Sequence, residues 1–185
     1  RPHESLALLD DCLKAAHGDR FEVGNALMLA LQAAEATGDP SYWTDLSALL
    51  ARYHVDGRDQ PAGIGLVVAA IVADVHGDET TARAKLDEMK RRSNEPIWPP
   101  RAASQVIAVV ESRVAWREHR FDEALVATDK LERFCRVHVR RAEILRDAGH
   151  VDEARAEVHK VLERADYCRS SCYEGVYTLE ALVLQ

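Results

Sequence analysis

The sequence lacks a hydrophobic run long enough to cross a membrane, and no segment of it resembles a signal peptide. Its longest uncharged stretch covers residues 60–73. A membrane-spanning helix needs about 20 predominantly apolar residues, so this stretch is too short. We therefore interpret it as a buried helix, and we expect a protein that stays out of membranes and works in the cytoplasm.

Cysteine is scarce, with four residues at Cys12, Cys135, Cys168 and Cys172. A chain of 185 residues can bury an extended core without disulfides, which suits a reducing cytoplasm. Cys168 and Cys172 would share one face of a continuous helix. A structural zinc site needs four ligands, however, and no second pair of Cys or His stands at a matching spacing. We predict ordinary thiols and no bound metal, with metal ligation or oxidant sensing by this pair as the alternative.

The motifs of common enzymes are also missing. The sequence has no nucleophile elbow and no kinase signature, and Gly63 and Gly65 lack the third glycine of a phosphate-binding loop. His3 and Glu4 lack the second histidine of a zinc-hydrolase motif. We predict that the protein is not an enzyme and has no catalytic residues and no cofactor. The alternative is a helical enzyme that gathers titratable groups from separate helices into one pocket.

Positive charge is in the minority, because 24 Lys and Arg residues stand against 31 Asp and Glu residues, for a formal net charge of −7. A protein held on nucleic acid by phosphate contacts needs the opposite balance. The composition therefore argues against a nucleic-acid partner. Up to Glu95 the chain has 10 basic and 16 acidic residues, and after Glu95 it has 14 basic and 15 acidic residues. A local anion-binding strip would therefore lie in the second half.

What the sequence does contain is a repeated helix–turn–helix signature. Each copy has a turn residue, then Asp or Glu at the start of the next helix, then an alanine. A glycine in the turn supplies the left-handed residue that ends a helix, and acidic residues suit the positive end of the helix dipole. In the second copy His119 stands where the others have glycine. The copies cover residues 77–82, 119–124 and 149–154.

Helical apolar spacing lies on both sides of these turns, so each turn joins two antiparallel helices. The repeat alanines Ala82, Ala124 and Ala154 are 42 and 30 residues apart. These intervals straddle the 34-residue period of the tetratricopeptide family, which the chain resembles, best over residues 136–166. The resemblance implies an all-α fold, an α-solenoid of antiparallel helix pairs, and we expect about ten helices. A related helical repeat with looser sequence rules is the alternative.

Residues 93–100 interrupt the repeat, because closely spaced prolines cannot continue a helix. We expect a loop there, and a bend, within one helical-repeat domain that covers residues 1–185. Other helix ends and starts are expected at Gly18, Gly38, Pro40 and Pro61. The chain begins at Arg1 without a methionine and ends in an apolar run, so we expect it to be an excerpt of a longer chain.

Tetratricopeptide-like arrays present the first helix of each pair on a concave face, where ligands bind. The resemblance assigns eight residues to this face: Val109, Arg113, Trp116, Arg117, Arg136, Val139, Glu143 and Arg146. Arginines beside a tryptophan favour binding, because guanidinium groups hold carboxylates at two points and indole buries a large area. The alternative is that the arginines are solvated and Trp116 packs at a repeat junction.

A run of arginines also favours an acidic partner, although acidic neighbours offset part of its charge. The run is Arg133, Arg136, Arg140 and Arg141, and the acidic neighbours are Glu132 and Glu143.

These features predict a protein-binding module that holds a peptide or a partner's helix along the concave face. The second hypothesis is a sensor or regulatory helical-repeat segment of a larger bacterial-type transcription regulator or signalling protein. An uncovered apolar helix face at the end of the array, near Leu184, would also favour a homodimer through the terminal helices.

Overall fold

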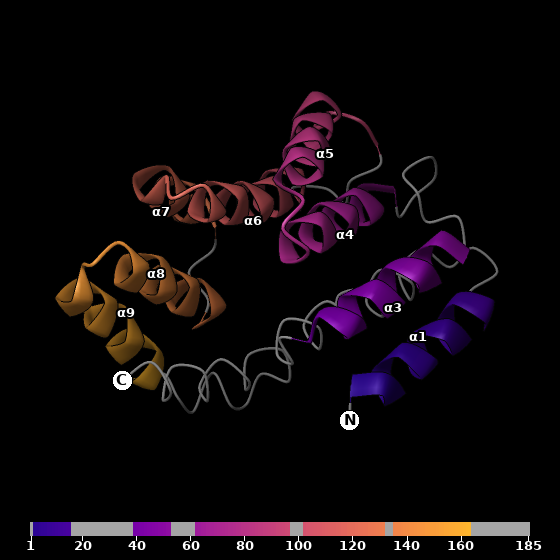
Figure 1. Ribbon diagram of the computed structural model, residues 1–185, viewed down its shortest axis with the longest axis horizontal. Helices are drawn as coiled ribbons and strands as arrows, with labels where there is room; N and C mark the ends of the chain where they lie inside the picture. The colour runs from indigo at the N-terminus through magenta and orange to yellow at the C-terminus, as the bar shows by residue number, and fades with distance from the viewer. Residues whose placement is uncertain (1, 16–38, 53–61, 97–101, 132–134, 164–185) are drawn as a thin grey trace. The chain divides into compact units, whose positions relative to one another are not determined.

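The computed structural model describes residues 2–15, 39–52, 62–96, 102–131 and 135–163 (Figure 1). Within these ranges the chain forms eight α-helices and no strand, so the all-α prediction is confirmed. The expected count of about ten stays a prediction, because residues 16–38 and 164–185 lie outside the described ranges. The helices are α1 (Pro2–Ala15), α3 (Pro40–Arg52), α4 (Ala62–Val75), α5 (Glu79–Arg91), α6 (Ala102–Arg117), α7 (Phe121–Asp129), α8 (Cys135–Asp147) and α9 (Val151–Glu163).

The chain divides into two compact units, Arg1–Val110 and Glu111–Gln185. The first holds α1, α3, α4, α5 and the start of α6, and the second holds the end of α6 with α7, α8 and α9. The division therefore falls within α6, after the proline-rich residues 93–100. Of those residues the structure describes Ser93 to Pro96, which form turns as predicted. The interpretation of residues 1–185 as one repeat domain stays a prediction.

The first unit is built around α4, most of whose described side chains are buried. Leu66, Val68, Ala70 and Ile71 are each at most 3% exposed. This confirms the interpretation of the uncharged stretch as a buried helix, and none of the described helices is long and apolar enough to span a membrane. The predicted start at Pro40 is also confirmed, since proline suits the first helical position. The Gly18, Gly38 and Pro61 boundaries lie outside the described residues.

Three turns in the described part of the chain have the same backbone hydrogen bonds. In each, the helix ends in a Schellman motif, in which one N–H reaches back five residues and the N–H before it reaches back three. The five-residue bonds are 2.8 Å for Asp78 to Ala73, 2.9 Å for Arg120 to Ala115 and 2.8 Å for His150 to Leu145. The three-residue bonds are 3.0 Å for Gly77 to Asp74, 2.9 Å for His119 to Trp116 and 3.0 Å for Gly149 to Arg146. The predicted repeat of the turn is therefore confirmed.

The left-handed residue of each turn stands where the sequence predicted it. Gly77 has a φ of 75° and Gly149 a φ of 86°, and His119 takes the same conformation with a φ of 58°. His119 offsets part of the conformational cost through an edge-on contact with Phe121, with ring centroids 5.7 Å apart. The alanines that follow, Ala82, Ala124 and Ala154, are all buried, as close helix packing requires.

Replacing Gly149 by alanine should lower the free energy of unfolding by about 1 kcal/mol, because an L side chain is strained at this φ. A Cβ at this position meets nothing within 4 Å, so the cost comes from the backbone alone. Gly149→Asn should cost less, because asparagine tolerates the left-handed region. Urea unfolding followed by circular dichroism measures both variants. Equal stability of the alanine variant and the wild type would contradict the role of this turn.

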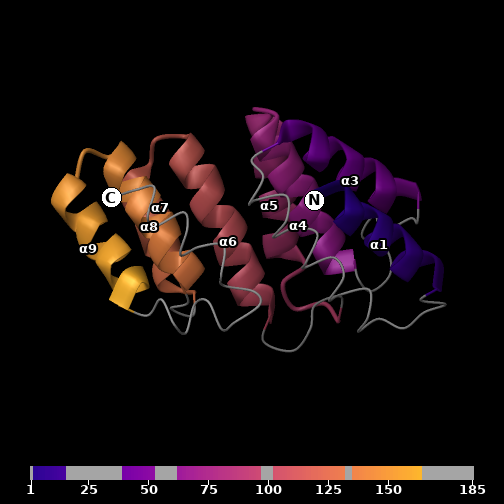
Figure 2. The same ribbon diagram turned by 90° about the horizontal axis from the view of Figure 1, so that it is seen from below.

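In the second unit each turn closes an antiparallel helix pair, and two apolar clusters fill the space between the helices. The first cluster joins three helices: Ala115 of α6, Ala124 of α7 and Ile144 of α8. The second joins α8 to α9 through Val139, Ala142, Val158 and Val161. Figure 2 shows α8 and α9 side by side, as Figure 1 does. Helix α8 thus packs on α6, α7 and α9.

Candidate protein-binding surface

The eight predicted binding residues all lie on α6 and α8, the first helices of two successive pairs. Arg117 and Arg146 are exposed, and Val109, Arg113, Trp116, Arg136 and Glu143 are half-buried. Val139 is buried, at 3% exposed, because it packs against α9 in the core. Val139 is therefore not part of an exposed face, so its predicted place there is wrong. Val109 belongs to the first unit, whereas the other predicted residues belong to the second.

Trp116 brings the two helices together. Its ring packs against the cluster of Ala115, Ala124 and Ile144. Its indole Nε1 donates a hydrogen bond to Oδ2 of Asp147 on α8, at 3.1 Å. The guanidinium of Arg140 lies over the ring, 5.0 Å from its centroid, in a cation–π contact. Trp116 therefore packs where α6 meets α8. The alternative interpretation of the sequence had placed it at such a junction, and these contacts orient its half-buried side chain.

Acidic side chains of α8 hold two of the arginines in place. Arg140 pairs with Glu143, with Nη1 and Oε2 3.0 Å apart. Arg146 contacts Oδ1 of Asp147 through both Nε and Nη2, at 3.0 and 2.9 Å. Asp147 thus accepts from Arg146 and from Trp116 on separate oxygens. The network fixes the positions of one aromatic ring and two guanidinium groups across adjacent helices.

We name the residues of this region the α6–α8 surface: Arg113, Trp116, Arg117, Arg136, Arg140, Glu143, Arg146 and Asp147. On α6, Trp116 and Arg117 lie three and four residues after Arg113. On α8 the residues follow one another at intervals of three or four, with Asp147 directly after Arg146. Each set therefore forms one stripe along its helix. The contacts of Trp116 with Arg140 and Asp147 place the two stripes beside each other.

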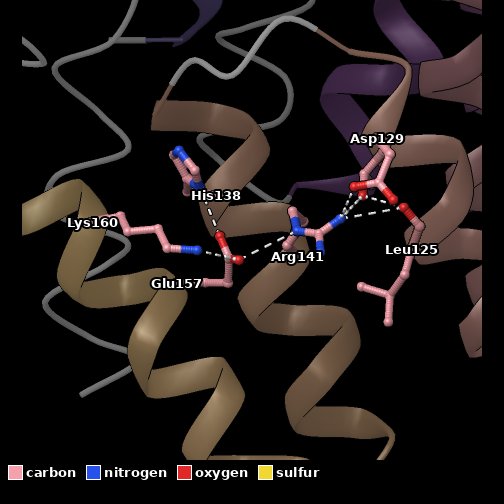
Figure 3. Close-up of polar contacts among 7 residues, drawn as sticks. Leu125, Asp129, His138, Arg141, Glu157 and Lys160 are labelled. Atoms are coloured by element: carbon pink, nitrogen blue, oxygen red, sulfur yellow. Dashed lines mark hydrogen bonds and ion pairs between the residues drawn. The ribbon is translucent and has the colours of Figure 1, made fainter.

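Arg141 belongs to the predicted run of arginines, but its guanidinium group lies between Glu157 of α9 and the Leu125 and Asp129 groups of α7, in a second polar cluster (Figure 3). The centre of that cluster is Glu157 of α9, which is 7% exposed. Its Oε2 lies 2.6 Å from Nδ1 of His138 on α8. Its Oε1 accepts from Nζ of Lys160 at 2.7 Å and from Nε of Arg141 at 3.4 Å.

Burial by itself raises the pKa of Glu157, but the groups around it have the larger combined effect. The hydrogen bonds from His138 and Lys160, with the positive charges of Lys160 and Arg141, lower the pKa from 4.5 to about 2. Glu157 is therefore ionised at neutral pH. Its carboxylate accepts from donors on both α8 and α9, so it joins these helices across their apolar contact.

Arg141 extends the cluster to a third helix. Its Nη1 donates to Oγ1 of Thr128 at 2.7 Å, to Oδ1 of Asp129 at 2.8 Å and to the carbonyl of Leu125 at 3.3 Å. These acceptors lie in the second half of α7, which ends at Asp129. Arg141 therefore links the end of one helix pair to both helices of the next.

The sequence did not point to this cluster directly, although it contains one signal of it. Glu157 stands three residues after Ala154 and four before Val161, within the apolar stripe of α9. A carboxylate at such a position needs a buried donor. His138, between Val137 and Val139, lies on the facing helix, but its pairing with Glu157 depends on how the two helices pack.

Among the described residues, no three His, Cys, Asp or Glu side chains are grouped as a metal site requires. This finding does not reach Cys168 and Cys172, which lie outside the described ranges. Cys12 and Cys135 lie in α1 and α8, and their side chains are not among those described. The predictions about metal and thiol chemistry therefore stay predictions.

The chain was also compared with known proteins. No protein-family model, no curated protein and no solved structure matches it.

Proposed function

We propose that this chain is a protein-binding module of tetratricopeptide-like helix pairs, and that its second unit holds a peptide or a partner's helix on the α6–α8 surface. The observation that carries the proposal is the placement of Trp116. It stands half-buried at the contact of α6 with α8, where its ring packs against the cluster that includes Ile144. Arg140 lies over the ring and Asp147 accepts from the indole N–H, and these contacts orient it. Rigid aromatic and arginine side chains are the most frequent anchors of protein interfaces.

The contacts of α8 support the repeat architecture. As a first helix, α8 lies beside the preceding first helix through Trp116, beside the preceding second helix through Arg141, and beside its own second helix through Val139. This is the neighbour pattern of stacked helix pairs. The identical Schellman turns at Gly77, His119 and Gly149 support the same reading.

Truncation of the anchor tests the proposal. Peptides selected from a random library against the whole chain should lose at least about 30-fold in affinity for a Trp116→Ala variant, since anchor residues contribute about 2 kcal/mol or more. Fluorescence anisotropy with the labelled peptides measures the dissociation constants. Circular dichroism checks the fold, and Trp116→Leu, which keeps apolar packing on Ile144, replaces the alanine variant if helicity falls.

Val126 provides the matched control. It is 58% exposed on α7, outside the α6–α8 surface, and Val126→Ala removes exposed apolar area from the same unit. We expect this variant to bind within about twofold of the wild type. Peptides that bind the Trp116 and Val126 variants equally well would place the binding site elsewhere and remove the support for this function.

A further inference from the structure

The α6–α8 surface has an excess of positive charge on a chain whose net charge is −7. It carries five arginines: Arg113, Arg117, Arg136, Arg140 and Arg146. Among the described residues of this surface two acids stand against them, Glu143 and Asp147, and both form ion pairs with Arg140 and Arg146. Glu132, which also offsets the run of arginines in the sequence, lies outside the described ranges. Arg113, Arg117 and Arg136 have interaction partners of their own. The basic character is therefore local to these helices and runs against the overall charge of the protein.

The second helices of the unit have the opposite bias at their starts. Asp122 and Glu123 open α7, and Asp152 and Glu153 open α9, whereas α8 has no acidic residue in its first turn. The arginines of the surface lie on α6 and α8, away from these acidic helix starts. A surface with an excess of one charge favours a partner of the opposite charge.

The anchor itself is also adapted to negative charge. Arg140 lies over the Trp116 ring and Asp147 accepts from the indole N–H, so a partner that contacts the ring also meets a guanidinium group. A guanidinium has five N–H donors, and one carboxylate occupies at most two of them. The ion pairs with Glu143 and Asp147 therefore orient Arg140 and Arg146 while leaving them able to bind another carboxylate.

We infer that the partner segment is acidic, with Asp or Glu side chains that meet the arginines of the α6–α8 surface around Trp116. This inference rests on the proposed function and adds the chemistry of the partner. An acidic protein segment fits better than a nucleic acid, because the −7 charge of the whole chain would repel an extended polyanion that reaches beyond this surface. A short segment is exposed mainly to the electrostatic field of the arginines on this surface, because salt screens more distant charges beyond about 10 Å.

A charge-reversal experiment tests the inference. Peptides selected from a random library against the whole chain should be enriched in Asp and Glu. Arg117→Glu combined with Arg146→Glu should weaken their binding at least about tenfold, since both side chains are exposed and like charges at an interface are unfavourable. The matched control is Arg155→Glu, because Arg155 is 67% exposed on α9 in the same unit. We expect less than about a threefold change for the control, and weaker wild-type binding as NaCl rises from about 0.1 M to about 0.5 M.

The outcomes separate the two proposals. Neutral or basic peptides that depend on Trp116 and tolerate the charge reversal would overturn the acidic partner and leave the binding function standing. Peptides that tolerate both Trp116→Ala and the charge reversal would remove the surface and with it both proposals. A labelled single-stranded RNA or duplex DNA that competes with the peptides at equal concentration would show that the surface takes nucleic acid instead, which also overturns the inference.

Discussion

A Glu157→Ala variant should lose about 3 kcal/mol of stability in the second unit. Removal of one partner of a buried ion pair costs about 3–5 kcal/mol, because the remaining charged groups lose their compensation. The lower end of this range applies here, since Lys160 is 45% exposed and can return to water. His138 and Arg141 are more buried, and they would face a void where the carboxylate was.

Hydrogen exchange followed by mass spectrometry resolves this effect by helix. Peptides from α8 and α9 should exchange faster in the variant, while peptides from α4 and α5 in the first unit should keep the wild-type rates. Glu163→Ala is the matched control, because Glu163 lies on the same helix, is 62% exposed and pairs with His159 at the surface. An exposed pair contributes at most about 1 kcal/mol, so the control should differ little from the wild type. Equal protection of α8 and α9 in the Glu157 and Glu163 variants would show that the buried cluster does not stabilise this pair of helices.

The helix pairs were predictable because their signals are local. A left-handed turn residue, acidic residues after it and an alanine in the next helix act within a few residues of one another. Even His119 could be placed in its turn from the flanking pattern, although only the structure shows its ring against Phe121. The buried alanines followed from the same pattern, since a small side chain at a fixed place after the turn is useful only where helices approach closely.

The polar contacts of the second unit were not predictable in this way, because they depend on the rotation of each helix about its axis. Arg140 and Arg141 are neighbours in the sequence, yet one lies over Trp116 and the other reaches Glu157 and the end of α7. Val139 was assigned to the binding face by its position in the repeat, and the structure places it in the core against α9. Successive side chains of a helix point in directions about 100° apart. The sequence therefore predicts that a helix has a polar stripe more securely than it predicts which neighbour each side chain of that stripe contacts.

The Glu157 cluster also stabilises the helix that carries most of the α6–α8 surface. The same helix, α8, carries Arg140 and Asp147 on the surface and His138 and Arg141 in the cluster. The cluster ties α8 to α9 and to the end of α7, while Ile144 ties it to α6. The orientation of the surface residues therefore depends on contacts that no partner would touch.

The stability contributed by Glu157 should vanish in acid. Its pKa is lowered from 4.5 to about 2 on folding, so the unfolded chain binds a proton before the folded one does as the pH falls. The contribution is complete above the unfolded value of 4.5, declines between about 4.5 and 2, and is lost below. One pKa unit corresponds to about 1.4 kcal/mol, so the full contribution is about 3 kcal/mol.

Urea unfolding of the wild type and of Glu157→Gln, measured side by side across this range, isolates the effect because the two proteins share every other carboxylate. The difference between them should be largest near neutral pH and should fall towards zero near pH 2, whereas a difference that stays constant with pH would mean that the charge of Glu157 is not what its partners stabilise.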